Sequence, residues 1–333
     1  MSDAKRLKST KVIGTHNGTF HCDEAFAVYL LRQTSEFKGA DVLRTRTPEK
    51  LAECDIVVDV GGVYDHGALR YDHHQREFFE TFGEGFKTKL SSAGLVYKHY
   101  GREIVASAIN ASPTDPNVDL LYLKLYKTFV EALDGIDNGI PQYESSEPQR
   151  YSSSTDLSSR VGFLNPAWNE SVDSAAVDAR FETASTLTGT EFASRLQSYV
   201  SAWLPAREIV RAAFDARSTV HPSGRIVLFT EYAPWKDHLY NLEEDAQLGE
   251  DALVLFVVYP DETAKAWRIQ AVTKKGEVFA NRKSLPEAWR GLRDDALSEV
   301  SGIPGGVFVH AAGFIGGNQT KEGALAMAQK ALE

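Results

Sequence analysis

Histidines and aspartates gather at four places in the first part of the chain, and the first of these is the densest. His16, His21 and Asp23 lie within eight residues, after an apolar segment at 11–14 and before the helix-like segment 23–32. Ligand sites in α/β folds lie beyond the carboxyl ends of strands, and two imidazoles with a carboxylate can converge on one cation. The alternative is a pair of surface histidines beside an aspartate that caps a helix.

The second place is Asp59, near the end of the apolar segment 54–60 and just before Gly61 and Gly62. A carboxylate at the tip of a buried strand is costly unless it is paired or binds a metal. A turn-forming aspartate before two glycines is the alternative.

The third place is a run of three potential ligands, Asp72, His73 and His74. Neighbouring side chains of an extended segment point to opposite faces, so the three need not bind the same ion. One histidine can instead meet a substrate phosphate. A solvated polar loop is the alternative, and nearby His66 is expected at the surface.

The fourth place is Asp134 and Asp137, near the end of a long amphipathic segment. Either aspartate can close a metal site, or both can cap and turn the chain. Taken together, carboxylates and histidines of this kind suit a pair of divalent cations. Two such ions can activate water and stabilise the charge that develops on a phosphoryl group.

The elements that must position these residues alternate between strand and helix. Segments 11–14 and 54–60 are expected as strands and 91–100 and 118–133 as helices, which predicts a mainly parallel α/β sheet. Residues 141–169 are expected as a long loop, and 172–216 as mostly helical with interruptions at 187–190 and Pro205. Strands are expected at 226–232, 253–259, 267–273 and 307–310, and helices at 286–301 and 320–332. We therefore expect a catalytic domain at 11–165, a helical connection at 166–222 and a mixed α/β cap domain at 223–333.

Composition narrows the class of protein. The chain has 333 residues, a formal net charge of −10 and two cysteines. The acidic balance argues against avid duplex binding, and so few cysteines suit a reducing intracellular compartment. No apolar run approaches the roughly 20 residues of a membrane span. The short basic N-terminus leaves a nuclear signal open.

The motif series HxxxxHxD, D, DHH and a later D resembles the DHH phosphoesterase superfamily. Longer strings resemble one of its families, the MYG (melanocyte proliferating gene) family, along nearly the whole chain from Lys11. They include the segments 15–24, 71–75, 91–97, 134–139, 267–272, 285–292 and 308–317. The resemblance implies a parallel-sheet DHH-type domain followed by a smaller mixed α/β (DHHA1-like) substrate-binding domain. It also implies a divalent-metal-dependent 3′→5′ RNA exonuclease in the nucleus, mitochondrion or cytosol.

The resemblance also implies roles for individual residues. The expected metal ligands are His16, His21, Asp23, Asp59, Asp72, His73 and Asp134, with Mn²⁺ the expected ion and Mg²⁺ the alternative. His21 stands where many relatives have aspartate. The expected catalytic residues are Asp59, His73 and His74, and His74 would protonate the leaving oxygen.

The C-terminal region resembles the substrate-binding cap of the superfamily. Its glycine-rich stretch precedes a helix, and backbone N–H groups there would cradle phosphate. The expected substrate-binding residues are His310, Gly316, Gly317, Asn318, Arg268 and Arg282. Trp168, Trp203, Trp235 and Trp289 can stack on bases, although packing is the more usual role of a tryptophan.

Two other functions remain open at this point. One is hydrolysis of a small substrate such as a short oligonucleotide, a dinucleotide or polyphosphate. The other is a catalytically retired RNA-binding or scaffold protein. The sequence also leaves a homodimer open.

Overall fold

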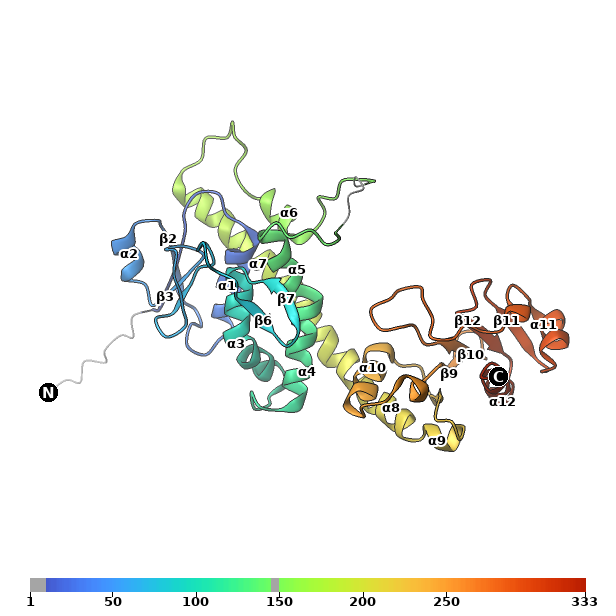
Figure 1. The fold of residues 1–333 in the computed structure, drawn as a ribbon. Helices are drawn as coiled ribbons and strands as arrows, with labels where there is room; N and C mark the ends of the chain where they lie inside the picture. The colour runs from blue at the N-terminus through green and yellow to red at the C-terminus, as the bar shows by residue number, and fades with distance from the viewer. Residues whose placement is uncertain (1–9, 145–149) are drawn as a thin grey trace. The chain divides into compact units, whose positions relative to one another are not determined.

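A computed structural model describes residues 10–144 and 150–333, and the chain divides into two compact units, Met1–Val200 and Ser201–Glu333 (Figure 1). The boundary falls inside the helical connection expected at 166–222, so its helices are shared between the units. Both units mix helices with sheets, as the sequence predicts. The basic N-terminal residues 1–9 lie outside the described residues.

Unit 1 contains a five-stranded sheet in the order β2-β1-β3-β5-β4. Its strands are β1 (Val12–Thr15), β2 (Asp41–Arg44), β3 (Ile56–Val58), β4 (Tyr64–Asp65) and β5 (Arg70–Tyr71). All pairings are parallel except that of β4 with β5. The segment expected at 54–60 is confirmed as the central strand β3, and its three residues are buried, as a continuous apolar run in a parallel sheet should be.

Helices make up most of the rest of unit 1. They are α1 (Cys22–Arg32), α2 (Pro48–Ala52), α3 (Ser92–Ile109), α4 (Pro116–Leu125), α5 (Glu131–Asp137), α6 (Leu157–Gly162) and α7 (Ser174–Ser198). A hairpin of β6 (Thr81–Gly83) and β7 (Phe86–Lys89) precedes α3. A π-helical segment, Tyr126–Val130, joins α4 to α5, so the helix expected at 118–133 is confirmed and extended. α1 is buried along nearly its whole length, and the ring of Phe26 lies 5.4 Å from that of Phe129 and 5.3 Å from that of Phe192.

Two expectations for the middle of the chain need correction. α7 continues through 187–190 without a break. Gly189 lies against the ring of Tyr29, where a Cβ atom would come within 2.0 Å of the ring carbon Cδ2. The glycine therefore serves close packing of α7 on α1 and does not end the helix. The loop expected at 141–169 contains α6, and its residues 145–149 lie outside the described residues.

Unit 2 contains a second five-stranded sheet, in the order β11-β12-β10-β9-β8. Its strands are β8 (Ile226–Leu228), β9 (Phe256–Asp261), β10 (Ala266–Ala271), β11 (Gly306–Val309) and β12 (Ile315–Asn318). Its helices are α8 (Leu204–Asp215), α9 (Arg217–Val220), α10 (Lys236–Asp245), α11 (Asp294–Ser301) and α12 (Lys321–Lys330). Pro205 lies in the first turn of α8, directly after a π-helical segment at Tyr199–Trp203. The chain stays helical through this point, so the break expected at Pro205 is wrong.

Alternate residues of β9 contribute to two apolar cores. Phe256 and Val258 pack in a cluster with Met327 of α12, whereas Val257 packs in a cluster with Phe214 of α8 and Leu239 of α10. Helices therefore cover both faces of the sheet at this strand. Along residues 10–144 and 150–333, no helix is both long and apolar enough to cross a membrane.

Candidate metal centre

The candidate ligands of unit 1 follow three neighbouring parallel strands directly at their carboxyl ends. His16 follows β1, Asp59 follows β3 and Asp72 follows β5, and these strands are adjacent in the sheet. The carboxyl ends of parallel strands meet at one edge, where α/β folds place their ligand sites. The first turn of α1 adds Asp23 and Glu24. Segments that are distant in sequence therefore present their ligand-type side chains together.

His16 stands at the centre of the first group of ligand atoms. Its Nε2 lies 3.1 Å from Oε1 of Glu24 and 3.3 Å from Oδ2 of Asp59. With His21, each of the four residues offers a nitrogen or oxygen within 4.8 Å of the others. Glu24 is a member that the sequence reasoning missed, and its place directly after Asp23 was the available signal.

His73 links two further groups of ligand atoms. Its Nδ1 lies 3.4 Å from Oδ1 of Asp59, and its Nε2 lies 3.0 Å from Oδ2 of Asp137. The second group is Asp59, Asp72, His73 and His74, and the third is Asp23, His73 and Asp137. Because Asp59 and His73 each belong to two groups, the three groups form one continuous set.

Buried polar atoms of this set suit a bound cation. Among the described residues, no hydrogen-bond partner reaches Oδ1 of Asp23, Oε2 of Glu24, Oδ1 of Asp59 or Nδ1 of His73. Leaving a buried acceptor unsatisfied costs about 1–3 kcal/mol, and divalent cations bind carboxylate oxygen and imidazole nitrogen. The residues present therefore fit one or more divalent cations.

The electrostatics of the site lead to the same conclusion. Burial, with the nearby carboxylates of Asp59 and Asp137, raises the pKa of Asp23 well above its ordinary value. Burial also raises the pKa of Asp59, to which the carboxylate of Glu24 contributes. Carboxylates crowded in this way ionise together only when a positive charge compensates them. Asp59 also has a left-handed backbone, with φ of 57°, a conformation that gathers at functional sites.

Metal binding at His16 should depend strongly on pH. Burial acts to lower the pKa of His16, but hydrogen bonds to Asp59 and Glu24 outweigh it and raise the pKa to about 9. A cation at Nε2 must displace that proton, so we expect Mn²⁺ affinity to rise about tenfold per pH unit up to pH 9. Calorimetric titration in buffers of different ionisation enthalpy measures both the affinity and the released proton.

The same pKa has a consequence for stability that serves as an internal control. The pKa of His16 in the folded state lies above the ordinary 6.5. The protonated imidazole therefore stabilises the fold to its full extent below pH 6.5. Chelator-treated protein should lose that stabilisation as the pH rises towards 9. His16→Gln should remove both effects. An Mn²⁺ affinity that is independent of pH would contradict this assignment of His16.

Asp72 and His74 form a hydrogen-bonded pair beside the set. Oδ1 of Asp72 accepts hydrogen bonds from the backbone N–H of His74 at 3.0 Å and lies 2.8 Å from its Nδ1, while Oδ2 accepts from the N–H of Gly62 at 2.6 Å. The hydrogen bond to Asp72 raises the pKa of His74. The imidazole is largely exposed. Asp72 thus orients the solvent-facing imidazole of His74, and its carboxylate also belongs to the second group of ligand atoms.

Asp134, an expected ligand, lies outside the three groups. Its Oδ1 accepts hydrogen bonds from the backbone N–H groups of Ser91 and Gly94 and from the hydroxyl of Ser91, and its Oδ2 accepts from the hydroxyl of Tyr126. A Cβ atom at Gly94 would lie 2.3 Å from Oδ2, so the glycine permits this close approach. Asp134 therefore binds the first turn of α3, and Asp137, one turn later on α5, lies beside the ligands.

Two arginines expected to bind substrate are engaged within unit 2. Arg282 donates to both carboxylate oxygens of Glu243, at 2.7 and 2.8 Å. Arg268 pairs with Asp261 at 2.7 Å and lies over the ring of Phe308. The paired Arg282 has a structural role that its sequence context did not reveal.

The expected glycine-rich loop is a strand of the sheet. Gly316 and Gly317 belong to β12, which pairs with β10 on one side and β11 on the other. Their backbone groups therefore serve the sheet and do not form a phosphate cradle. Asn318 is fully buried, and its side chain bonds to the backbone of Pro304 and Thr320. His310 is exposed beside the ring of Phe314.

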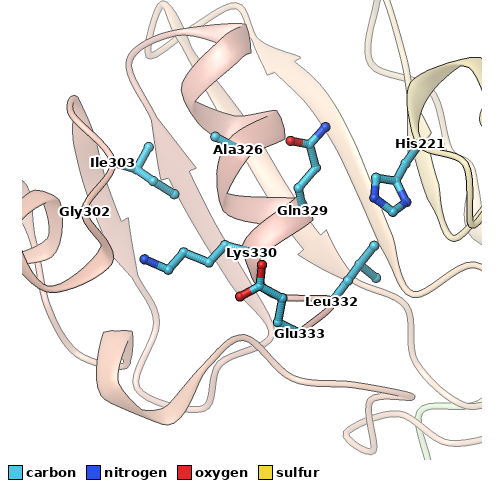
Figure 2. A pocket seen from close by; sticks show the side chains of 8 residues that line it. All are labelled: His221, Gly302, Ile303, Ala326, Gln329, Lys330, Leu332 and Glu333. Carbon is cyan, nitrogen blue, oxygen red and sulfur yellow. The ribbon is translucent and has the colours of Figure 1, made fainter.

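One cavity of unit 2 lies elsewhere, beside α12 (Figure 2). It measures about 670 Å³ and is lined by His221, Gly302, Ile303, Ala326, Gln329, Lys330, Leu332 and Glu333. The ammonium group of Lys330 donates to the carbonyl of Ser301 at 2.6 Å. None of the three groups of metal-ligand atoms includes a residue of this cavity. The candidate chemistry therefore remains in unit 1.

The fold and the site define an α/β protein with a candidate divalent-metal centre at the carboxyl edge of a parallel sheet. The family model MYG1_exonuc, described as an uncharacterised protein family (UPF0160), matches residues 12–332, and the chain belongs to this family. "MYG1 protein C27H6.8" of Caenorhabditis elegans is 50% identical, with 97% of this chain and 96% of the relative covered. "MYG1 exonuclease" of Homo sapiens is 51% identical, with coverage of 98% and 87%. "MYG1 protein YER156C" of Saccharomyces cerevisiae is 44% identical over the full length of both.

Proposed function

We propose that the protein is a divalent-metal-dependent phosphodiesterase that removes nucleotides from the 3′ end of single-stranded RNA. The observation that carries the proposal is the continuous set of histidines and carboxylates, with unpartnered buried acceptors, at the carboxyl ends of β1, β3 and β5. The mixed imidazole and carboxylate donors favour Mn²⁺. Bound divalent ions would supply a water of lowered pKa and positive charge for the phosphoryl oxygens.

The residues of the chain supply the remaining chemistry. His16, Asp23, Glu24, Asp59, His73 and Asp137 would hold the ions. Asp72 orients His74 and, by its hydrogen bond, keeps the imidazole protonated to a higher pH. A protonated, exposed imidazole next to the ligands is placed to give its proton to the leaving oxygen. Burial of Asp23 and Asp59 limits competing water around the charged groups.

The activity class is supported by relatives. Human and mouse proteins that are 51% and 52% identical to this chain are each named an exonuclease. The RNA substrate and the 3′→5′ direction rest on the resemblance of the motifs to the DHH superfamily. The net charge of −10 favours a local grip on one strand over broad electrostatic binding of a duplex.

Exposed aromatic side chains next to Asn165, which holds the segment between His16 and His21, support a polymeric substrate. Asn165 holds the backbone of Phe20, between His16 and His21, by two hydrogen bonds of 3.0 and 2.9 Å. On either side of Asn165, Phe163 is 80% exposed and Trp168 is 97% exposed. Trp203, Trp235 and Trp289 are buried, so packing is confirmed for them. Exposed aromatic rings are the usual stacking partners of unpaired bases.

The proposed substrate is tested with an RNA of about 20 nucleotides, which is long enough for several bases to contact the protein. The RNA is labelled at its 5′ end and incubated with Mn²⁺. We expect a ladder of labelled products that shorten stepwise. Immediate release of a labelled mononucleotide would reverse the direction. Cleavage of a dinucleotide with the RNA left intact would indicate a small-substrate phosphoesterase. Binding of RNA and Mn²⁺ without cleavage of either substrate would indicate a retired enzyme.

Trp168→Ala provides a second readout within the same assay. Loss of one stacking contact should weaken binding of the long RNA by about 1–3 kcal/mol. Cleavage of a dinucleotide should be nearly unchanged, because it spans fewer bases, so the ratio of the two rates serves as the control. Equal loss on both substrates would place Trp168 outside the path of the strand.

A further inference from the structure

One arginine of the metal-site pocket has no role in the function proposed so far. A cavity of about 190 Å³ is lined by His16, His21, Arg46, Asp59, Val60, Gly61, Asp72 and His74. Five of these residues belong to the groups of metal-ligand atoms. Arg46 is the one arginine or lysine that lines this cavity, and among the residues that the structure describes it has no carboxylate partner.

The backbone around Arg46 is fixed next to β1. The N–H of Thr45 donates to the carbonyl of Thr15 at 2.7 Å, and the hydroxyl of buried Thr45 accepts from the N–H of Thr47 at 3.2 Å. Arg46 follows β2, whose carboxyl end lies beside that of β1. The arginine is therefore held at the same sheet edge as the candidate ligands.

Other arginines nearby are committed to structural partners. Arg32 pairs with Glu182, and Arg44 pairs with Asp178 and donates to the carbonyl of Gly18. Arg46 forms no ion pair within residues 10–144 and 150–333. Its Nη2 lies 3.2 Å from Nδ1 of His16. The guanidinium of Arg46 therefore lies at a cavity lined by carboxylates, and no carboxylate pairs with its charge.

The contact with His16 does not neutralise Arg46. Nδ1 of His16 lies 3.2 Å from the carbonyl of Asn17 as well as from Nη2 of Arg46. A carbonyl only accepts, so Nδ1 meets Asn17 as a donor, and a nitrogen that carries a proton offers Arg46 no acceptor. The guanidinium therefore keeps donors and positive charge that complement an anion at this cavity.

We propose that Arg46 binds the non-bridging oxygens of the scissile phosphate and of the phosphate on the released nucleotide. This inference rests on the proposed phosphodiesterase function. A guanidinium presents parallel N–H donors that match a phosphate group, and its positive charge opposes the negative charge that builds up during phosphoryl transfer. Arg46 would thus be a further catalytic residue, supplied by the loop after β2.

The test compares Arg46→Gln and Arg46→Lys with the parent protein and with Lys50→Gln, an exposed position on α2 that loses the same charge. Binding of adenosine 5′-monophosphate to Mn²⁺-loaded protein is measured by calorimetry, together with Mn²⁺ stoichiometry. We expect Arg46→Gln to bind the nucleotide about tenfold or more weakly, Arg46→Lys to recover part of the affinity, and Lys50→Gln to match the parent. Mn²⁺ stoichiometry should stay unchanged in all four.

Each other outcome overturns a definite part of the proposal. If Arg46→Gln binds the nucleotide as the parent does, or weakens it only as much as Lys50→Gln, Arg46 does not contact phosphate. If Arg46→Gln instead loses Mn²⁺, the arginine positions His16. If the parent neither binds the nucleotide nor cleaves RNA, the proposed function fails and this inference fails with it.

Discussion

Asp59→Asn is expected to lower the rate of phosphodiester hydrolysis by about 10³–10⁴-fold, the scale of losing one member of a catalytic unit. Oδ2 of Asp59 faces His16 and Oδ1 faces His73, so the carboxylate joins two of the three groups of ligand atoms. An amide keeps one acceptor oxygen and replaces the other with an N–H donor. The variant therefore cannot bridge the two groups.

The folded state should tolerate this change. Asparagine adopts the left-handed backbone that Asp59 has, with φ of 57°, more readily than most residues do. The substitution also removes a carboxylate whose pKa burial and Glu24 raise, so it relieves repulsion. The substitution also loses part of the pairing with His16, so chelator-treated Asp59→Asn should melt close to the Tm of the chelator-treated parent.

Two measurements separate loss of the site from loss of the fold. Adding Mn²⁺ should raise the Tm of the parent, because a ligand that binds the native state stabilises it, and should leave Asp59→Asn nearly unmoved. Asp41→Asn, the same chemical change at the exposed amino end of β2, is the matched control and should behave like the parent. Hydrolysis by Asp59→Asn at the rate of the parent would contradict the proposed mechanism, in which Asp59 helps to hold the divalent ions.

Asp134→Ala is expected to cost about 3–5 kcal/mol of the free energy of unfolding, because it leaves four buried donors without their acceptor. Those donors are the two N–H groups and one hydroxyl at the start of α3 and the hydroxyl of Tyr126. Burial raises the pKa of Asp134 to about 7, so denaturation in urea at pH 8 compares proteins in which the parent carboxylate is ionised.

Asp137→Ala is the matched variant, one helical turn away, and it should show the opposite pattern. The Asp137 carboxylate is 20% exposed and faces Nε2 of His73, so its loss should change the stability of chelator-treated protein by less than about 1 kcal/mol. Asp137→Ala should weaken Mn²⁺ binding by at least about 10–100-fold, because even the loss of a residue that only hydrogen-bonds to a metal ligand has an effect of this size. Stable Asp134→Ala protein with weakened Mn²⁺ binding would restore Asp134 as a ligand.

Much of the site was predictable because it depends on local properties of the chain. Apolar runs that end at His16 and Asp59 indicate strand tips, and strand tips in a parallel sheet meet at one edge. The run Asp72-His73-His74 offers ligand atoms whatever its surroundings. The structure brings all five into the three groups of ligand atoms, with His21 and Asp23.

The choice between Asp134 and Asp137 was not open to sequence reasoning. The two lie three residues apart, on nearly the same face of one helix, and both residue types can bind metal or cap a helix. The N-terminus of α3, with Gly94 small enough for close approach, takes the first carboxylate by hydrogen bonds. Residues some forty positions away in sequence therefore decide which aspartate faces the ligands.

The glycine-rich end of the chain shows the same limit. Gly316 and Gly317 favour a turn by composition, because glycine adopts conformations closed to other residues. In the structure they belong to a strand held by β10 and β11, where a Cβ at Gly317 would lie 2.6 Å from Arg268. Packing against neighbours, rather than turning, accounts for the glycine.

The sequence by itself determined which ligand-type side chains the protein offers and which strands and helices carry many of them, because residue type and periodicity are properties of neighbouring residues. Only the tertiary structure decided that Glu24, Arg46 and Asp137 lie at the candidate metal site and that Arg282 pairs with Glu243 in unit 2. Arg46 and Asp137 meet His16 and His73, which lie far along the chain. Glu24 is near His16 in sequence, but it also joins the distant Asp59. Such contacts form only when the sheets and helices pack, so local sequence patterns carry no record of them.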